Sequence, residues 1–336
     1  MSENRKKLRI GVCGVGSIGF RHARLLSLRA DTDLLICDMA QEHLDAAADL
    51  PNLKFSTNSF DELLDSGLDG LIIATPDKFH IAQAEAALKK QIAVLIEKPV
   101  AENTAQGERL LKTISETNGK VLVGYPLRHN LIFLKAKELI DEGAIGSPVS
   151  FHIMLGSYNT LVAAKNRFNA DDRDKLFVDY SHEWDYLNWF LGKTKRAAAV
   201  SHQSGNREKT QKPNVVNAIL ELESGISGTA HLDYVYSPGM RNFTVIGDQG
   251  TVGIDAVKGI VSLQVYSEEF ERTYKFNESF DSMMSRQIDH FVAVIENKED
   301  VRVTLDDGLN ALRIADSLII SSQILTFQPV FDNLVQ

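Results

Sequence analysis

The chain has 336 residues, more than one typical core accommodates, so we expect two domains. Its net charge of −9 argues against a nucleic-acid partner, because phosphate contacts require clustered Lys and Arg. No apolar run approaches the roughly 18 residues of a membrane span, and the first apolar segment is too short for a signal peptide. The two cysteines make no disulfide framework, so a cytoplasmic protein is expected.

The first part of the chain alternates short apolar runs with helical patterns. The expected strands are Leu8–Cys13, Leu34–Cys37, Leu53–Phe55, Gly70–Ala74, Ala93–Ile96 and Val121–Val123. The helical patterns are Ile18–Arg29, Gln41–Asp49, Phe60–Asp65, His80–Lys90 and Ala105–Asn118. This alternation predicts parallel strands, and their continuous apolarity predicts burial on both faces. We therefore expect a doubly wound (Rossmann) α/β sheet of strand order 3-2-1-4-5-6.

The second part of the chain has mainly strand character. The expected strands are Val149–Leu155, Val215–Glu223, Ile226–Val235, Phe243–Ile246, Thr251–Ile254 and Val261–Val265. The expected helices are Asn130–Glu142, His182–Leu191, Met283–Glu296 and Asp306–Leu325. A mostly two-residue period predicts an antiparallel sheet with one covered face. We expect a Rossmann domain at 1–125 and an α+β domain at 126–336, built on a large, mainly antiparallel sheet, with the boundary near Tyr125-Pro126.

Three glycines with G-x-G-x-x-G spacing follow the first expected strand and open the first helix, which is the context a dinucleotide-binding loop requires. Gly14 permits a tight turn, Gly16 lets the backbone approach a pyrophosphate, and Gly19 lets the helix pack closely on the strand. The pyrophosphate would meet the N–H groups at the start of this helix, which include those of Ser17 and Ile18.

The second expected strand ends in Asp38, 19 residues after Gly19. An acidic residue at this position accepts hydrogen bonds from the hydroxyls of the adenine ribose. The next residues, Met39 and Ala40, carry no charge, so a 2′-phosphate would meet a carboxylate and find no Arg. This favours NAD over NADP as the cofactor.

Polar residues also follow the fourth and fifth strands. Thr75, Pro76 and His80 follow the fourth, and Glu97-Lys98-Pro99 follows the fifth. Both segments lie at carboxyl ends of parallel strands, where open α/β sheets bind ligands. Away from such a position, a lysine after a strand is more often a solvated residue.

A third segment lies in the second part of the chain. His182 and Asp185 are three residues apart and share one face of a helix, whereas Trp184, Leu187 and Leu191 mark the face that packs inward. On spacing alone, His182 also fits a helix-start residue with ordinary hydrogen bonds.

With these motifs on one chain, the sequence resembles the sugar and cyclitol dehydrogenase family that includes glucose-fructose oxidoreductase and inositol dehydrogenase (Gfo/Idh/MocA). The resemblance extends nearly end to end, and the Glu-Lys-Pro motif is its most specific part. It rests on the glycine loop, Ala74-Thr75-Pro76 with His80, Glu97-Lys98-Pro99, His182-x-x-Asp185 with Trp189-Phe190-Leu191-Gly192, and Ala136–Pro148.

The resemblance implies roles for these residues. Lys98 would lie between nicotinamide and substrate and donate hydrogen bonds to the reacting hydroxyl, and His182 would be the general base. The unperturbed pKa of His, near 6.5, suits that role. Asp179 would orient substrate or assist His182, while Tyr125 and Arg128 match a region that lines the family's pocket. The implied cofactor contacts are Gly14, Gly16, Ser17, Ile18, Gly19, Asp38, Thr75, Pro76, His80, Glu97 and Lys98.

The sequence departs from the family pattern near Asp179. Many members carry Asp four residues before the histidine, where this chain has Val178, and many have a Gly-Gly-Gly run where this chain has the charged stretch Asp172–Phe177. Asp77 also stands where the family often has Asn. These departures concern substrate identity more than reaction type.

The leading hypothesis is an NAD-dependent dehydrogenase that acts on a secondary alcohol of a sugar, sugar derivative or cyclitol. One alternative is a non-catalytic regulator of the same fold, like a yeast galactose-pathway repressor. Another is a glycosidase that uses NAD transiently. Net formation of NADH would separate the first hypothesis from the other two.

Further expectations concern partners. No His/Cys cluster has metal-ligand spacing, so no metal is expected, and neither nucleic acid nor membrane is an expected partner. The open face of the second sheet needs a cover, so we expect a homodimer or homotetramer.

Overall fold

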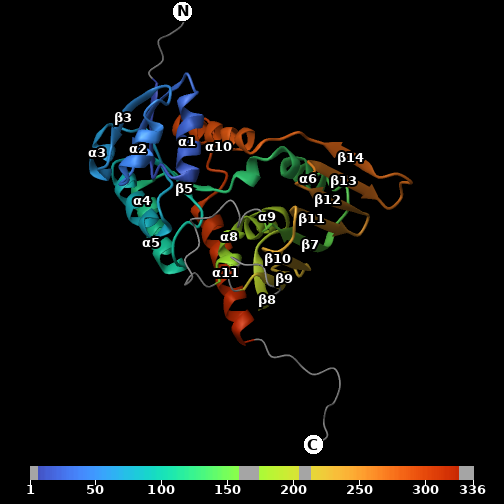
Figure 1. Cartoon of the computed structure of the whole chain (residues 1–336). Coiled ribbons are helices and arrows are strands. Elements are labelled where there is room, and N and C mark those ends of the chain that lie inside the picture. Colours follow the sequence, from blue (N-terminus) through green and yellow to red (C-terminus); the bar gives the residue numbers. More distant parts are fainter. Residues whose placement is uncertain (1–6, 159–173, 204–212, 325–336) are drawn as a thin grey trace, which may run out of the picture. The chain divides into compact units, whose positions relative to one another are not determined.

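The computed structural model describes residues 7–158, 174–203 and 213–324, and its chain forms two compact units (Figure 1). The first consists of Met1–Leu134 and Asn277–Leu312, and the second of Lys135–Phe276 and Arg313–Gln336. The domain boundary expected near Tyr125-Pro126 stays a prediction. The first compact unit also includes 277–312, because a helix in that segment contributes to its core.

The first unit is built on a six-stranded parallel sheet of order β3-β2-β1-β4-β5-β6, which confirms the expected doubly wound fold. Its strands are β1 (Leu8–Cys13), β2 (Thr32–Cys37), β3 (Leu53–Thr57), β4 (Gly70–Ile73), β5 (Ala93–Glu97) and β6 (Val121–Gly124). Its helices are α1 (Ser17–Ser27), α2 (Gln41–Ala47), α3 (Phe60–Asp65), α4 (His80–Lys89), α5 (Thr104–Thr117) and α10 (Phe280–Ile295), with 3₁₀ turns η1 (Asp77–Phe79) and η2 (Pro126–His129).

Helix α10 belongs to the core of this unit although it comes late in the chain. It lies beside α1 (Figure 1) and buries Met284, Ile288 and Phe291 in the apolar cluster that also contains Ile10 of β1 and Leu34 of β2. Helices α1 and α2 contribute to the same cluster. The sheet is therefore covered on this face by helices from both ends of the chain.

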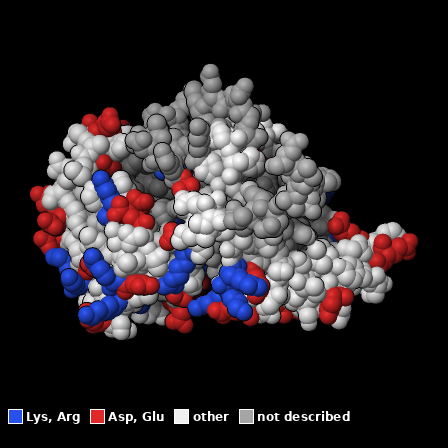
Figure 2. All heavy atoms as spheres, turned by 90° about the horizontal axis from the view of Figure 1, so that it is seen from below, with Lys and Arg blue, Asp and Glu red and all other residues white. Residues whose placement is uncertain are grey.

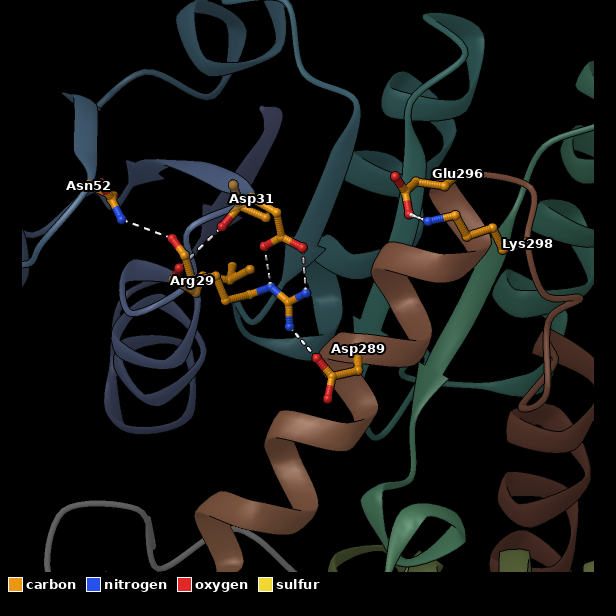
Figure 3. Close-up of polar contacts among 8 residues, drawn as sticks. Arg29, Asp31, Asn52, Asp289, Glu296 and Lys298 are labelled. Carbon is orange, nitrogen blue, oxygen red and sulfur yellow. Dashed lines mark hydrogen bonds and ion pairs between the residues drawn. The ribbon is translucent and has the colours of Figure 1, made fainter. Parts of the chain in front are cut away.

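Polar contacts add to this packing at the turn between α1 and β2 (Figure 3). The Arg29 guanidinium donates two hydrogen bonds to the carboxylate of Asp31, at 2.9 and 2.8 Å, and a third to Asp289 of α10. Asn52 donates to the carbonyl oxygen of Arg29 at 2.9 Å. This network joins α10 to the edge of the sheet, while the buried apolar side chains supply most of the attachment energy.

The second unit contains an eight-stranded sheet of order β14-β13-β12-β11-β7-β10-β9-β8. All neighbouring strands in it are antiparallel except β7 and β10, which confirms the expected mainly antiparallel sheet. The strands are β7 (Pro148–Gly156), β8 (Thr194–His202), β9 (Val215–Leu222), β10 (Ser227–Asp233), β11 (Met240–Gly247), β12 (Gly250–Asp255), β13 (Ile260–Val265) and β14 (Arg272–Lys275).

One face of this sheet is covered and the other is open over its central strands. On the covered face, helix α9 (Ser181–Leu191) packs Tyr186 and Phe190 against Phe243 of β11, with ring centroids 5.0 and 5.2 Å apart. The open face carries exposed side chains such as Met154 and Ile219. The remaining helices are α6 (Leu131–Asp141), α8 (Lys175–Asp179) and α11 (Leu305–Ile324), of which α6 and α11 cross the border between the units.

Two further features concern the surface and the helices. On the face drawn in Figure 2, Lys and Arg side chains are interspersed with Asp and Glu. Over the three described stretches of chain, no helix combines the length and the apolar character needed to span a membrane.

Candidate active site

The glycine loop has the geometry that its spacing predicts. Gly14 has φ +83°, and a Cβ there would lie 2.7 Å from the backbone of Ala74 and Thr75. At Gly19 a Cβ would lie 1.7 Å from the carbonyl oxygen of Gly14, so only glycine lets α1 approach the loop. A Cβ at Gly16 would have no neighbouring atom closer than 3.9 Å, so there is room over the loop for a ligand.

The start of α1 is suited to an anion. Gly16 is its N-cap residue, and glycine has no side chain that could accept hydrogen bonds from the first-turn N–H groups. These groups include those of Ser17 and Ile18. The first turn contains no acidic residue. The helix dipole and these N–H groups together form a phosphate-binding element.

Asp38 lies beside this loop, just beyond β2. Its carboxylate accepts hydrogen bonds from the N–H groups of Val15, at 2.6 Å, and Ala40, at 2.9 Å. His43 of α2 approaches the same carboxylate, with Nδ1 3.1 Å from Oδ2. Asp38 thus holds the loop in shape and places a negative charge next to it, which suits ribose hydroxyls and disfavours a 2′-phosphate.

The segment after β4 is tied to the segment after β5 by a histidine. His80 is almost fully buried, with Nε2 2.7 Å from the carbonyl oxygen of Thr75 and Nδ1 2.9 Å from that of Pro99. Burial lowers the pKa of His80 below its usual value, against the opposing effect of these two carbonyls and of the Asp77 and Glu97 carboxylates. Through its two ring nitrogens, His80 thus joins the main chain after β4 to the main chain after β5.

Glu97 and Lys98 lie at the end of β5. The Glu97 carboxylate is buried, accepts a 3.3 Å hydrogen bond from the N–H of Lys98, and has Oε1 2.7 Å from Nε2 of His22 on α1. The peptide between Lys98 and Pro99 is cis. The two sequence neighbours of Lys98 are thus each held by a histidine: Glu97 by His22 of α1, and Pro99 by His80 of α4.

Besides Lys98, two residues of the first unit are expected to contact substrate, and both are buried. Tyr125 is 1% exposed and Arg128 is 4% exposed. The Arg128 guanidinium pairs with Asp307 at 3.0 Å. Their role as substrate contacts stays a prediction.

Asp179 and His182 lie close in sequence at the junction of α8 and α9, in the second unit. Asp179 accepts a 2.9 Å hydrogen bond from the hydroxyl of Tyr234, and the Tyr180 and Tyr234 rings lie 5.3 Å apart. Burial, with the nearby Asp179 carboxylate, raises the pKa of Tyr234 well above its usual value, so this hydroxyl remains a donor.

Helix α9 is anchored around His182 by buried polar contacts. The indole of Trp184 donates to the carbonyl oxygen of Phe177 at 2.9 Å, and the fully buried Glu183 pairs with Arg241 of β11 at 2.9 Å. His182 itself is half-buried, whereas Asp185 is buried. Of the charged stretch 172–177, residues 172 and 173 lie outside the described residues.

The structure adds two residues that the sequence alone did not single out, His22 and Tyr234. Each contacts a predicted site residue, Glu97 and Asp179 respectively. His22 follows Gly19 by three residues on the buried face of α1, and that placement was the available signal. Among the described residues, no cluster of three or more His, Cys, Asp or Glu could hold a metal ion.

Comparison with known protein families identifies both halves of the chain. Residues 8–125 match an oxidoreductase family model described as an NAD-binding Rossmann fold, and residues 137–325 match the C-terminal alpha/beta domain of the same family. The chain belongs to the Gfo/Idh/MocA oxidoreductase family. It is an NAD-dependent oxidoreductase, and the resemblance based on its motifs is confirmed.

Individual relatives are distant in sequence but match nearly the whole chain. The scyllo-inositol 2-dehydrogenase (NAD(+)) of Bacillus subtilis is 24% identical, over 90% of this chain and 91% of its own. A scyllo-inositol dehydrogenase structure from Lactobacillus casei, with bound NAD(H) and scyllo-inositol, has a TM-score of 0.79 at 22% identity and covers 95% and 97% of the two chains.

A third relative carries a different ligand. The WlbA dehydrogenase structure from Bordetella pertussis, in complex with NADH and UDP-GlcNAcA, has a TM-score of 0.77 at 22% identity and covers 95% of this chain and 97% of its own. The same fold therefore occurs with polyol and with nucleotide-sugar ligands.

Proposed function

We propose that this oxidoreductase oxidises a secondary alcohol of a cyclitol, sugar or sugar derivative, with Lys98 and His182 in its catalytic site. The observation that carries the proposal lies in the first unit. The glycine loop and Asp38 lie at the carboxyl ends of β1 and β2, and the buried Glu97 next to Lys98 lies at the carboxyl end of β5, which β4 separates from β1. A dinucleotide cradle and a candidate catalytic cation thus share one edge of one sheet.

The residues present fit NAD. Close packing at Gly14 and Gly19, open space at Gly16 and the start of α1 would hold the pyrophosphate. Asp38 would accept hydrogen bonds from the adenine ribose. Thr75 and Pro76 follow β4, His80 begins α4 and Glu97 ends β5, and these four residues would shape the nicotinamide end of the site.

The chemistry follows from two side chains. When bound, NAD would supply the acceptor for the hydride that leaves the alcohol carbon. Lys98 donates a hydrogen bond to the reacting oxygen and stabilises its negative charge as it develops. His182 takes the hydroxyl proton, so that the alcohol becomes a ketone with one hydride and one proton removed. Asp179, held by Tyr234, orients the substrate or His182.

The substrate class is narrowed by the relatives and by the sequence. The Bacillus subtilis and Lactobacillus casei proteins are named for scyllo-inositol, which makes inositols the first substrates to test. Charged residues in place of the family's glycines, among them Asp174 and Lys175 at the start of α8, make sugar acids and aminated or phosphorylated sugars the second set.

We also propose that a second copy of the chain covers the open face of the large sheet. This face presents Met154, His152, Thr229 and Ile219 in neighbouring strands, which is a surface with few charges. A face of this kind is rarely left in water, and symmetric self-association is the common solution. Analytical ultracentrifugation tests this, and a monomer at micromolar concentration would contradict it.

The function is tested by incubating the protein with NAD or NADP and each of a set of inositols, sugars and sugar acids, with absorbance read at the nicotinamide band. We expect stoichiometric NADH with at least one polyol and a weaker response with NADP. Product without net NADH would support the glycosidase alternative instead. Tight NAD binding with no turnover on any compound would support a regulator.

A further inference from the structure

Two buried histidines, from two different helices, contact the Glu97–Pro99 segment. His22 comes from α1 and contacts the side chain of Glu97, while His80 begins α4 and contacts the main chain of Pro99. Both are at least 98% buried. Lys98 lies between these two points of attachment, so its backbone is held on each side.

The contact made by His22 is specific. Its Nε2 lies 2.7 Å from Oε1 of Glu97, and its Nδ1, also buried, has no hydrogen-bond partner among the described residues. An apolar side chain would fill the same space without leaving a polar atom unsatisfied. What His22 adds is therefore the hydrogen bond that its Nε2–H donates to the Glu97 carboxylate.

Glu97 in turn contacts the backbone of Lys98. The second carboxylate oxygen, Oε2, accepts the N–H of Lys98 at 3.3 Å. Gly124 of β6 lies directly against this carboxylate, and a Cβ there would come within 3.0 Å of Cδ and Oε1. Glycine at this position gives the carboxylate room to lie between His22 and the backbone of Lys98.

His80 fixes the other side of Lys98. Its ring bridges the carbonyl oxygens of Pro99 and Thr75, which belong to the segments that follow β5 and β4. The neutral ring donates its one N–H to one of these oxygens, and protonation lets it donate to both. In either state, the start of α4 stays next to the residue that follows Lys98.

We propose that His22 and His80 are positioning residues that together fix the backbone of Lys98 at the end of β5. The inference rests on the proposed function, in which the Lys98 ammonium contacts the reacting oxygen. A displacement of about 1 Å in such a group lowers turnover by as much as 100-fold, and loss of an outer partner of a site residue commonly costs 10–100-fold.

The first test compares His22→Leu with His22→Gln. The leucine variant keeps the volume and loses the hydrogen bond, whereas the glutamine amide can again donate to Glu97. We expect His22→Leu to lower kcat about 10–100-fold, with KM for NAD changed less than about threefold, and His22→Gln to recover most of the loss. His80→Leu and Gly124→Ala should lower kcat in the same way, because they disturb Pro99 and Glu97 without altering His22.

His290→Leu is the matched control. It also removes a buried histidine whose ring nitrogen lies 2.7 Å from a glutamate, here Glu299, in the same unit. We expect it to cost stability but to leave kcat within about twofold of the wild type. An equal loss of kcat in His290→Leu and His22→Leu would overturn the proposal.

The second readout needs no substrate. Hydrogen–deuterium exchange is measured by mass spectrometry on the peptide that spans residues 93–101, in the wild type and in each variant. We expect faster exchange of the Lys98 amide in His22→Leu and Gly124→Ala but not in His290→Leu, and unchanged exchange in the first two would overturn the proposal. If the wild type turns over no compound, the proposed function fails, and this exchange result still decides the positioning role.

Discussion

The two sheets of this protein differ in how many of their faces are buried. The six-stranded parallel sheet is covered on both faces, and its candidate site residues project from strand ends that neighbouring helices hold in place. The eight-stranded sheet is covered on one face, and its candidate site residues lie on short helices instead. The first unit thus positions its candidate site residues through its core, whereas the second leaves one face of its sheet exposed.

The largest expected effect separates the two sheets by stability. Phe291→Ala removes a fully buried ring from the covered face of the parallel sheet and should lower the free energy of unfolding by about 3–5 kcal/mol. Val257→Ala, in the turn between β12 and β13 of the other unit at 63% exposure, should change it by less than about 0.5 kcal/mol. Urea denaturation measures both, and equal losses would break the comparison.

The next effect concerns chemistry at the end of a covered strand. Lys98→Ala should keep NAD affinity, measured by fluorescence titration, while kcat falls about 100–1000-fold, because a preorganised donor to the developing charge is lost. Lys112→Ala serves as the control, since its side chain is 80% exposed on α5. Undiminished turnover in Lys98→Ala would remove Lys98 from the mechanism.

A third effect tests how deeply the first unit buries its polar groups. Burial lowers the pKa of His129 to about 3, aided by the positive charges of Arg302, Arg286 and Arg128 and by His290. The unfolded chain takes up a proton near pH 6.5 and the folded chain does not, so acidification favours unfolding.

His129→Gln lacks this penalty. The free energy of unfolding of the wild type should therefore fall by about 2 kcal/mol more than that of the variant between pH 7 and pH 5. Urea titrations at the two pH values measure the difference. If the difference in free energy of unfolding between the two proteins were the same at both pH values, His129 would be protonated in the folded state.

The smallest effect concerns cofactor choice at the edge of the parallel sheet. Asp38→Ala should weaken NAD about tenfold, near 1.4 kcal/mol, and narrow the preference over NADP, because the carboxylate next to the ribose is removed. Asp31→Ala, which removes an exposed carboxylate on the same unit, should leave both affinities unchanged. A wild type that already prefers NADP would contradict the role given to Asp38.

The sequence predicted every strand of the parallel sheet, but of the antiparallel sheet it predicted only the inner strands. All six parallel strands were expected in their observed order, because strands buried on both faces are continuously apolar. The two strands that were missed, β8 and β14, are the two edges of the antiparallel sheet. Edge strands carry charged residues, such as Arg196 and Arg272, that suppress aggregation and also erase the apolar period.

A similar limit applies to the candidate site. Residues in local motifs, such as Gly14 and Lys98, could be identified because their spacing along the chain is itself the signal. The contacts of His22 with Glu97 and of Tyr234 with Asp179 join residues 75 and 55 positions apart. Spacing along the chain carries no information about such pairs, so only the folded structure shows them.

The order in which the first unit receives its parts has a consequence for synthesis on the ribosome. The sheet is complete when β6 ends at Gly124, but α10, which covers its apolar face, ends only at Ile295. At about 5–20 residues per second, these roughly 170 residues take about 10–35 s to emerge. The first unit therefore cannot complete the apolar cluster that contains Ile288 and Phe291 until well after its last strand has been made.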